Sequence, residues 1–268
     1  MNDALHVVLG GYPAATLAVA FFKANLVAAV MILAVAAARI VARRAFGPAA
    51  AYQLWILPPV AGFLALVIDL ARPHVDPAIF AVSPVVATTW VAGALAMAAL
   101  FTLAQMRFQA EVRAGRAGPA VIGFISPIIV MPADDGRYTA EERELIRAHE
   151  REHVARKDPR AAAYAALLQC LCWFNPFVHF AAYLIRLDQE LACDAAVVRS
   201  RPAARALYAR TLLKTQLAGS PLPLGCYWSP RGQHPLELRI ASLKRTSKTP
   251  PRATGGTFAA ASVDAIRP

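Results

Sequence analysis

The residues with the clearest chemical potential lie in one short stretch, His149-Glu150-Arg151-Glu152-His153. On a helix, histidines four residues apart lie one turn apart, so both imidazoles can bind the same Zn²⁺ ion. The intervening Glu150 can hold the attacking water and act as the catalytic acid/base. The pattern predicts the metal site of a zinc hydrolase. The alternative is a surface helix that carries two ordinary histidines.

A third protein ligand is expected downstream, because catalytic zinc sites use three protein ligands and keep one position for water. Glu190 and Asp194 lie four residues apart and share one face of a predicted helix. Glu190 can complete the coordination of the metal, and Asp194 can accept a hydrogen bond from a ligand histidine and fix its tautomer. Both could instead be solvated surface acids, and Asp188 is a weaker competitor on a different face.

The elements that must position these residues follow from local patterns. Thr139-Ala-Glu-Glu142 is a capping box, which predicts a helix that begins there and ends before Pro159. Asp158, at the end of that helix, could anchor a loop. Upstream, the β-branched runs Val121–Ile122 and Ile128–Val130 flank a turn-like stretch and predict a short β-hairpin.

Residues 161–185 contain no charged side chain. Their number would span a bilayer, but Asn175-Pro176 interrupts the run, and a crossing would put Glu190 on the far side. We therefore expect two helices that meet at residues 173–176 and are buried against the zinc helix or dip into the membrane interface. The second helix should continue through Asp194, and a weaker helix is expected at about 202–217.

The composition indicates a membrane protein. The chain has 268 residues, of which 57% are hydrophobic and only 17% charged, whereas a soluble domain has about 25% charged residues. Four cysteines without a CxxC pair exclude a disulfide scaffold and a zinc ribbon. Residues 1–106 hold only five of the 28 Lys and Arg. This asymmetry predicts an apolar membrane domain followed by a basic, water-facing one.

Three segments qualify as membrane spans, at about 16–41, 50–71 and 85–105. The positive-inside rule places the N-terminus outside and the residues after about 107 in the cytoplasm. We attribute the basic excess to orientation and lipid attraction, and expect no direct nucleic-acid binding. The arginines that decide the orientation follow the first and third spans: Arg39, Arg43, Arg44, Arg107, Arg113 and Arg116.

Several segments, in this order, resemble the BlaR/MecR-type membrane metallopeptidases, a family of antirepressors and signal transducers. HExxH alone is shared by many families, whereas its combination with WFNP and ELACD is much more specific. The matching segments are Tyr52–Trp55, Pro119–Pro132, His149–Asp158, Trp173–Val178, Glu190–Val197 and Leu236–Lys244.

The resemblance implies a gluzincin-like zinc site in the cytoplasm, close to the membrane. In that assignment His149, His153 and Glu190 bind Zn²⁺, Glu150 is the catalytic residue and Asp194 supports the site. It also implies that the peptidase causes the loss of a cytoplasmic transcriptional repressor. The best-known members carry a fourth span and an extracellular penicillin-binding sensor, but only about 24 residues follow Lys244 here, so we do not expect β-lactam sensing.

The sequence as a whole predicts a mainly α, polytopic helical membrane protein with a small β-hairpin. We divide it into a membrane domain (1–106), a cytoplasmic zinc metallopeptidase domain (107–245) and a disordered tail (246–268). The expected partners are the lipid bilayer of the inner membrane and a protein substrate; the oligomeric state is not predicted. A membrane quality-control metalloprotease and a non-catalytic regulatory binding module are the alternatives.

Overall fold

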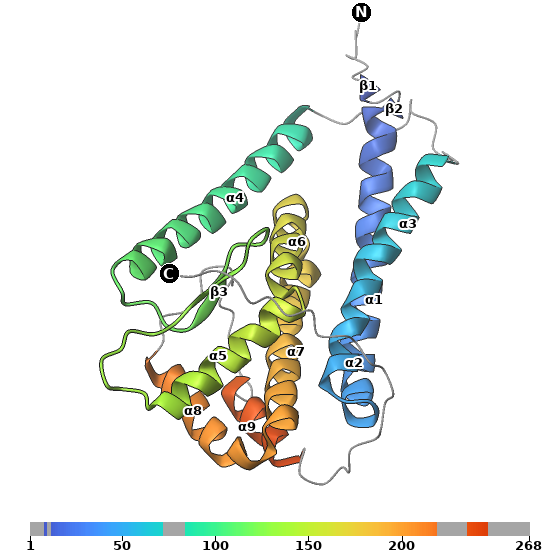
Figure 1. Ribbon diagram of the computed structural model, residues 1–268. Helices are drawn as coiled ribbons and strands as arrows, with labels where there is room; N and C mark the ends of the chain where they lie inside the picture. Colours follow the sequence, from blue (N-terminus) through green and yellow to red (C-terminus); the bar gives the residue numbers. More distant parts are fainter. Residues whose placement is uncertain (1–7, 10–11, 72–83, 219–234, 246–268) are drawn as a thin grey trace, which may run out of the picture.

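The structure is a computed structural model that describes residues 8–9, 12–71, 84–218 and 235–245 (Figure 1). These residues are mainly helical and include a small antiparallel hairpin after the third membrane helix, which confirms the predicted fold class. A second pair of short strands, β1 (Val8–Leu9) and β2 (Tyr12–Pro13), precedes the first helix and was not predicted. The predicted tail at 246–268 lies outside the described residues.

Three helical stretches among the described residues are long and apolar enough to cross a membrane. They agree with the three predicted spans, although their ends extend further. The first is α1 (Ala14–Ala45), and the third is α4 (Pro84–Arg113), which runs as one helix through the proposed domain boundary at residue 107. The second consists of α2 (Pro48–Gln53), the 3₁₀ turn η1 (Leu54–Ile56) and α3 (Leu57–Ala71).

Helices α1 and α3 pack side by side (Figure 1). A Cβ on Gly62 of α3 would lie 3.2 Å from the Cβ of Ala28, so glycine allows the close approach of the two helices. Lys23, a charge within the first predicted span, pairs with Asp69 of α3 at 2.6 Å. The pairing explains how α1 accommodates this charge.

The predicted hairpin is confirmed. Strands β3 (Ala120–Ile122) and β4 (Ile128–Val130) pair antiparallel, with Val121 opposite Ile129. Gly123 begins the turn at φ 86°, and a Cβ there would lie 2.7 Å from the carbonyl oxygen of Ser126. Only glycine fits this turn without strain.

Helix α5 (Ala140–Ala155) carries the HExxH stretch, and both bonds of its predicted capping box are present. The Thr139 hydroxyl accepts from the Glu142 amide, and the Glu142 carboxylate accepts from the Thr139 amide. After α5 the chain turns at Lys157, whose φ of 60° is left-handed. Helix α6 (Asp158–Leu171) begins at once, so Asp158 starts α6 instead of ending α5, and its carboxylate contacts His153 near the end of α5.

The charge-free run folds as the two predicted helices, α6 and the first half of α7 (Pro176–Ser200). Asn175 caps α7, because its side-chain oxygen accepts from the Phe177 amide. The 3₁₀ turn η2 (Pro202–Ala204) and α8 (Arg205–Ala218) confirm the weaker predicted helix. Helix α9 (Pro235–Arg245) was not predicted as an element.

Two hydrophobic clusters hold α7 in place. One joins α7 to α5, α8 and α9, and the other joins α7 to α1 and η1. Helix α7 therefore connects the membrane helices to the helix that carries the HExxH stretch. The buried members of the first cluster are Leu145, Val197, Val198, Tyr208, Leu212 and Leu243; those of the second are Ile32, Val35, Trp55, Ala181 and Leu184.

Candidate metal centre

The side chains of His149 and His153 on α5 lie close to the side chain of Glu190 on α7. The two Nε2 atoms lie 3.1 Å apart, and they lie 3.3 and 3.5 Å from the nearest carboxylate oxygens of Glu190. Zinc with bonds of about 2.0–2.1 Å in tetrahedral geometry holds its ligand atoms about 3.3 Å apart. The spacing of the three side chains, which we proposed as ligands from the sequence, is therefore compatible with a zinc-sized cation.

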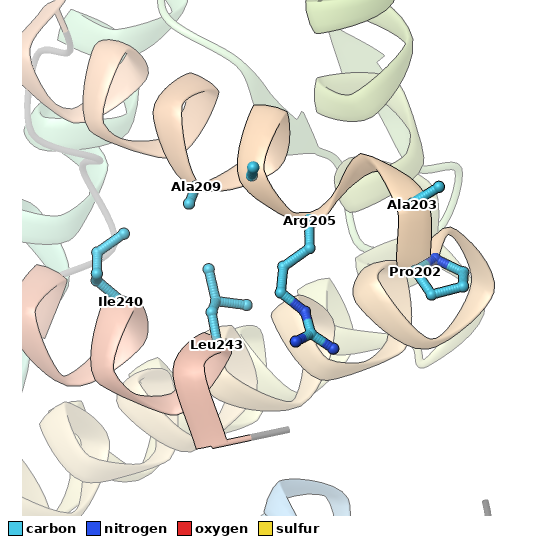
Figure 2. A pocket seen from close by; sticks show the side chains of 7 residues that line it. Pro202, Ala203, Arg205, Ala209, Ile240 and Leu243 are labelled. Atoms are coloured by element: carbon cyan, nitrogen blue, oxygen red, sulfur yellow. The ribbon is translucent and has the colours of Figure 1, made fainter. Parts of the chain in front are cut away.

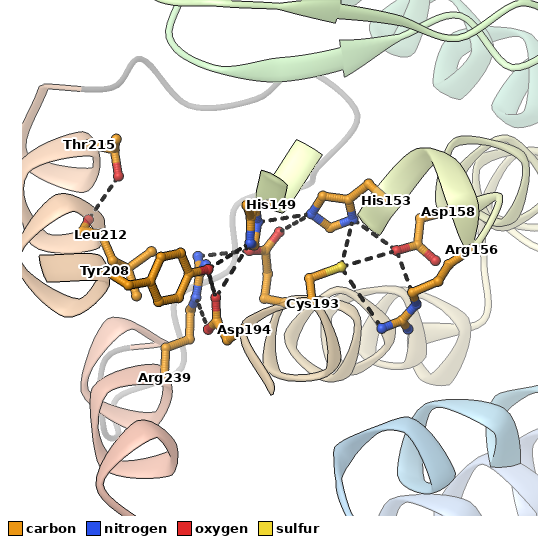
Figure 3. Close-up of polar contacts among 11 residues, drawn as sticks. His149, His153, Arg156, Asp158, Cys193, Asp194, Tyr208, Leu212, Thr215 and Arg239 are labelled. Carbon is orange, nitrogen blue, oxygen red and sulfur yellow. Dashed lines mark hydrogen bonds and ion pairs between the residues drawn. The ribbon is translucent and has the colours of Figure 1, made fainter. Parts of the chain in front are cut away.

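The opposite ring nitrogens of both histidines are engaged, which fixes the orientation of the rings (Figure 3). His149 Nδ1 lies 2.8 Å from the Tyr208 hydroxyl, and His153 Nδ1 lies 2.8 Å from Asp158 Oδ2. Because the hydroxyl donates to Asp194 at 2.6 Å, it accepts from the Nδ1–H of His149. When both rings are neutral, as metal binding requires, these contacts keep the proton on each Nδ1 and direct each Nε2 lone pair towards Glu190.

Asp194 lies close to His149, but it does not make the direct hydrogen bond that we expected from the sequence. Its Oδ1 atom is 3.6 Å from His149 Nδ1, too far for a direct hydrogen bond, and the Tyr208 hydroxyl bridges the two groups. Its carboxylate is fully buried and accepts from Arg239 Nε and Nη2, both at 2.8 Å. Asp194 thus orients Tyr208, and Tyr208 orients His149.

Arg239 of α9 also binds the proposed third ligand, with Nη1 2.8 Å from Glu190 Oε2. One guanidinium therefore holds both acids of α7. Sequence reasoning missed Tyr208 and Arg239 as site residues, because they lie on α8 and α9 without any fixed spacing to the HExxH stretch. Arg239 does fall within Leu236–Lys244, which the resemblance had already marked.

The electrostatics of the site differ from residue to residue. Burial raises the pKa of Glu150, although the two neighbouring histidines oppose this. Burial would lower the pKa of His153, but its bonds to Asp158, Cys193 and Glu190 raise it well above the usual value. Burial would raise the pKa of Glu190, but Arg239 and the histidines hold it well below the usual value. Glu190 is therefore anionic, and a bound cation would replace the proton that His153 attracts.

A second group of possible ligand atoms, from His153, Asp158 and Cys193, lies beside the first. It uses the Nδ1 atom of His153, which already contacts Asp158, and the Cys193 sulfur lies 3.4 Å from that nitrogen. Burial raises the pKa of the Cys193 thiol, which favours its neutral form. These contacts indicate support for His153 rather than a second metal site.

A shallow pocket lies elsewhere, between η2, α8 and α9 (Figure 2). It contains none of the candidate metal-site residues, and its lining is mostly apolar, so it is not part of the candidate metal centre. The residues that line it are Pro202, Ala203, Arg205, Ala206, Ala209, Ile240 and Leu243.

Comparison with known proteins identifies the family. Residues 104–243, more than half of the chain, match the family described as BlaR1 peptidase M56. The chain belongs to this family. The matched region includes every residue of the candidate metal centre, and the family agrees with the resemblance seen in the sequence.

One relative is the Regulatory protein BlaR1 of Bacillus licheniformis, which is 31% identical over 100 residues. The match covers 36% of this chain and only 17% of the relative, so the chain corresponds to a small part of that protein. No solved structure matches the chain.

Proposed function

We propose that the chain is a membrane-embedded zinc endopeptidase that cleaves a protein at the cytoplasmic face of the inner membrane. The observation that carries this proposal is the triangle formed by His149 Nε2, His153 Nε2 and the Glu190 carboxylate, with sides of 3.1–3.5 Å. Membership of the M56 peptidase family supports the hydrolytic activity. The arginines that follow the first and third spans support the cytoplasmic placement.

The residues of the site suit peptide hydrolysis. When bound, zinc supplies a Lewis acid that polarises the scissile carbonyl and lowers the pKa of a coordinated water. Glu150 would accept a proton from the attacking water and deliver it to the leaving amine. Its raised pKa brings its proton affinity closer to neutral pH, which suits both steps. Tyr208 and Asp158 hold the ligand imidazoles in place throughout.

We further propose that cleavage removes a cytoplasmic transcriptional repressor in response to a signal. The relative that matches the chain is a regulatory protein, which supports a signalling role over membrane quality control. The bilayer and the protein substrate are then the two partners of the chain.

The test is a comparison of metal content and proteolysis between the wild type and Glu150→Gln. The full chain is purified in detergent, its zinc is measured by elemental analysis, and cleavage is followed on a candidate repressor and on a proteome-derived peptide library. We expect about one zinc per chain in both proteins, because three other side chains hold the metal. The wild type should cleave the substrate, whereas Glu150→Gln should not.

Glu152→Gln is the matched control, because it makes the same change on the same helix but outside the cluster of ligand atoms. It should retain both zinc and cleavage. A wild-type chain without zinc would contradict the metallopeptidase proposal. Zinc without cleavage of any substrate would instead support the non-catalytic binding module, and cleavage of unfolded membrane proteins rather than the repressor would support quality control.

A further inference from the structure

Helix α6 and the first half of α7 form a hairpin that stands between α1 and α4 (Figure 1). The tip of this hairpin contacts α1 near its N-terminal end. The Phe174 ring lies 6.3 Å from the Phe21 ring, and Asn175 Nδ2 donates to Asn25 Oδ1 at 3.3 Å. The tip therefore lies deep along a helix that is long and apolar enough to cross a membrane.

The other side of the tip is bound to α4. Trp90 Nε1 donates to the carbonyl oxygen of Leu171 at 2.9 Å, and Trp173 Nε1 donates to the carbonyl oxygen of Trp90 at 3.1 Å. The Trp173 indole also packs directly against Gly93, where an added Cβ would overlap it. Two predicted spans thus hold the hairpin at the same end.

The lengths of the contacting segments show how far α7 follows α1. At the lower end of the contact, Arg39 Nη1 donates to Asp188 Oδ1 at 2.9 Å. Asn25 and Arg39 are 14 residues apart on α1, and Asn175 and Asp188 are 13 residues apart on α7. At 1.5 Å per residue, both separations are about 20 Å. Helix α7 therefore runs beside α1, in the same direction, over most of the roughly 30 Å of a hydrocarbon core.

The outer surface of the hairpin is apolar. Residues 161–185 carry no charged side chain, and Tyr164 is 70% exposed and Leu167 53% exposed. Two further polar side chains near the tip bond within the hairpin: Gln169 to His179 at 3.1 Å, and His179 to the Trp173 carbonyl at 2.9 Å. The large exposed side chains are Tyr164, Leu167, Leu168, Phe174, Phe177 and Phe180.

We propose that residues 161–185 form a re-entrant hairpin that enters the bilayer from the side of the metal centre and contacts lipid acyl chains. Its depth is set by α1 and α4, whose own exposed apolar faces continue its surface. Helix α6, with 14 residues, measures about 21 Å and is too short to cross, so the chain enters and returns on one side. The bonded side chains of Gln169, Trp173, Asn175 and His179 and the apolar outer face suit a hydrocarbon environment.

This arrangement places the metal centre at the membrane surface. Asp158, which contacts His153, is the first residue of α6, and Glu190 follows the apolar half of α7 by five residues. Both legs of the hairpin thus leave the bilayer beside site residues. The placement depends on neither bound metal nor turnover, so its test is separate from that of the proposed function.

The test is photo-crosslinking of the full chain in vesicles of phosphatidylethanolamine and phosphatidylglycerol. The photoreactive residue p-benzoylphenylalanine replaces Leu167 on α6 or Phe177 on α7, in two separate variants, and the adducts are identified by mass spectrometry. Leu100 on α4, 62% exposed, is the lipid-facing control, and the exposed Arg199 at the far end of α7 is the water-facing control.

We expect phospholipid adducts at Leu167 and Phe177 at the level seen for Leu100 and at least tenfold above Arg199. Adducts to a second copy of the chain, or to another protein in place of lipid, would overturn the proposal. Lipid adducts no more frequent than at Arg199 would also overturn it. Because the two positions lie on different helices, a variant that fails to fold does not prevent the test.

Discussion

At the scale of single residues, two hydrogen bonds orient the imidazole rings of the candidate metal site. Tyr208 accepts from His149, and Asp158 accepts from His153, each at 2.8 Å. Both bonds leave the Nε2 lone pairs free on the side of Glu190. Residues that orient metal ligands in this way typically change metal affinity by 10- to 100-fold when they are lost.

Tyr208→Phe should therefore weaken zinc binding by about tenfold or more. The substitution keeps the buried ring in its hydrophobic cluster but removes the hydroxyl between His149 and Asp194. Competition with a chelating dye measures the affinity. Tyr164→Phe makes the same change at an exposed position and should leave the affinity unchanged. Equal zinc affinity in the Tyr208 variant and the wild type would contradict the proposed role of the hydroxyl.

The site could be predicted from the sequence only where its residues share a helix or a motif. His149, Glu150 and His153 are linked by helical spacing, and Glu190 and Asp194 by the i, i+4 pattern. Long-range packing decides the rest. Tyr208 reaches the site because α8 packs on α5, and Arg239 because α9 packs on α7. No helical spacing links either residue to the HExxH stretch.

At the scale of elements, a buried ion pair ties α7 to the membrane helices. The carboxylate of Asp188 is fully buried and accepts from Arg39 of α1 at 2.9 Å and from the Trp55 indole at 2.8 Å. The sequence placed Asp188 on a different face of the helix from Glu190, and in the structure that face packs against α1 and η1. Glu190 follows two residues later, so the position of the third ligand depends on this contact.

Asp188→Asn should destabilise the protein by about 3–5 kcal/mol, because it leaves the buried charge of Arg39 without its partner. It should also lower zinc affinity through the loosened α7. Thermal unfolding in detergent and dye competition measure the two effects. Asp69→Asn removes the acid of the more exposed Lys23–Asp69 pair and should cost less stability and no zinc affinity. Equal effects of the two variants would refute the coupling.

Glu142, in the first turn of α5, should make the stability of the protein depend on pH in the acid range. The Lys214 side chain and the Thr139 amide, both bonded to Glu142, lower the pKa of its carboxyl. Glu142 therefore contributes its full stabilisation above its unfolded pKa of about 4.3, and loses it as pH falls through the lower folded pKa.

Glu142→Gln should accordingly lower the melting temperature at neutral pH and reduce the loss of stability on acidification from pH 6 to pH 3. The measurement is a series of thermal melts across this range. Glu141→Gln removes the same charge from the exposed neighbour in the first turn and should leave the pH dependence as in the wild type. A Glu142 variant with the same acid profile as the wild type would rule out this contribution.

Most elements could be predicted because their signals are local. The capping box, the β-branched hairpin and the charge-free helices all follow from short patterns. The docking of the α6–α7 hairpin could not be predicted, because it depends on Trp90 and Gly93, which lie some 80 residues from Trp173 in the chain. Helix α9 has only 11 residues and is held by packing on α7 and α8.

On the scale of the whole molecule, the uneven composition has a structural explanation. The apolar residues form three membrane helices and the α6–α7 hairpin, whereas the charged residues gather on α5, the second half of α7, α8 and α9. The candidate metal centre lies where these two parts meet, on α5 and α7. An enzyme built in this way would act on substrates at the membrane surface.

The central claim is that His149, His153 and Glu190 bind one zinc ion. X-ray absorption spectroscopy of the zinc-loaded full chain in detergent tests it most directly. We predict nitrogen and oxygen ligands at about 2.0–2.1 Å, including two imidazoles, and a spectrum that changes in Glu190→Gln. A sulfur ligand at about 2.3 Å would instead indicate binding through Cys193, and that result, or a spectrum unaffected by the Glu190 substitution, would contradict the account.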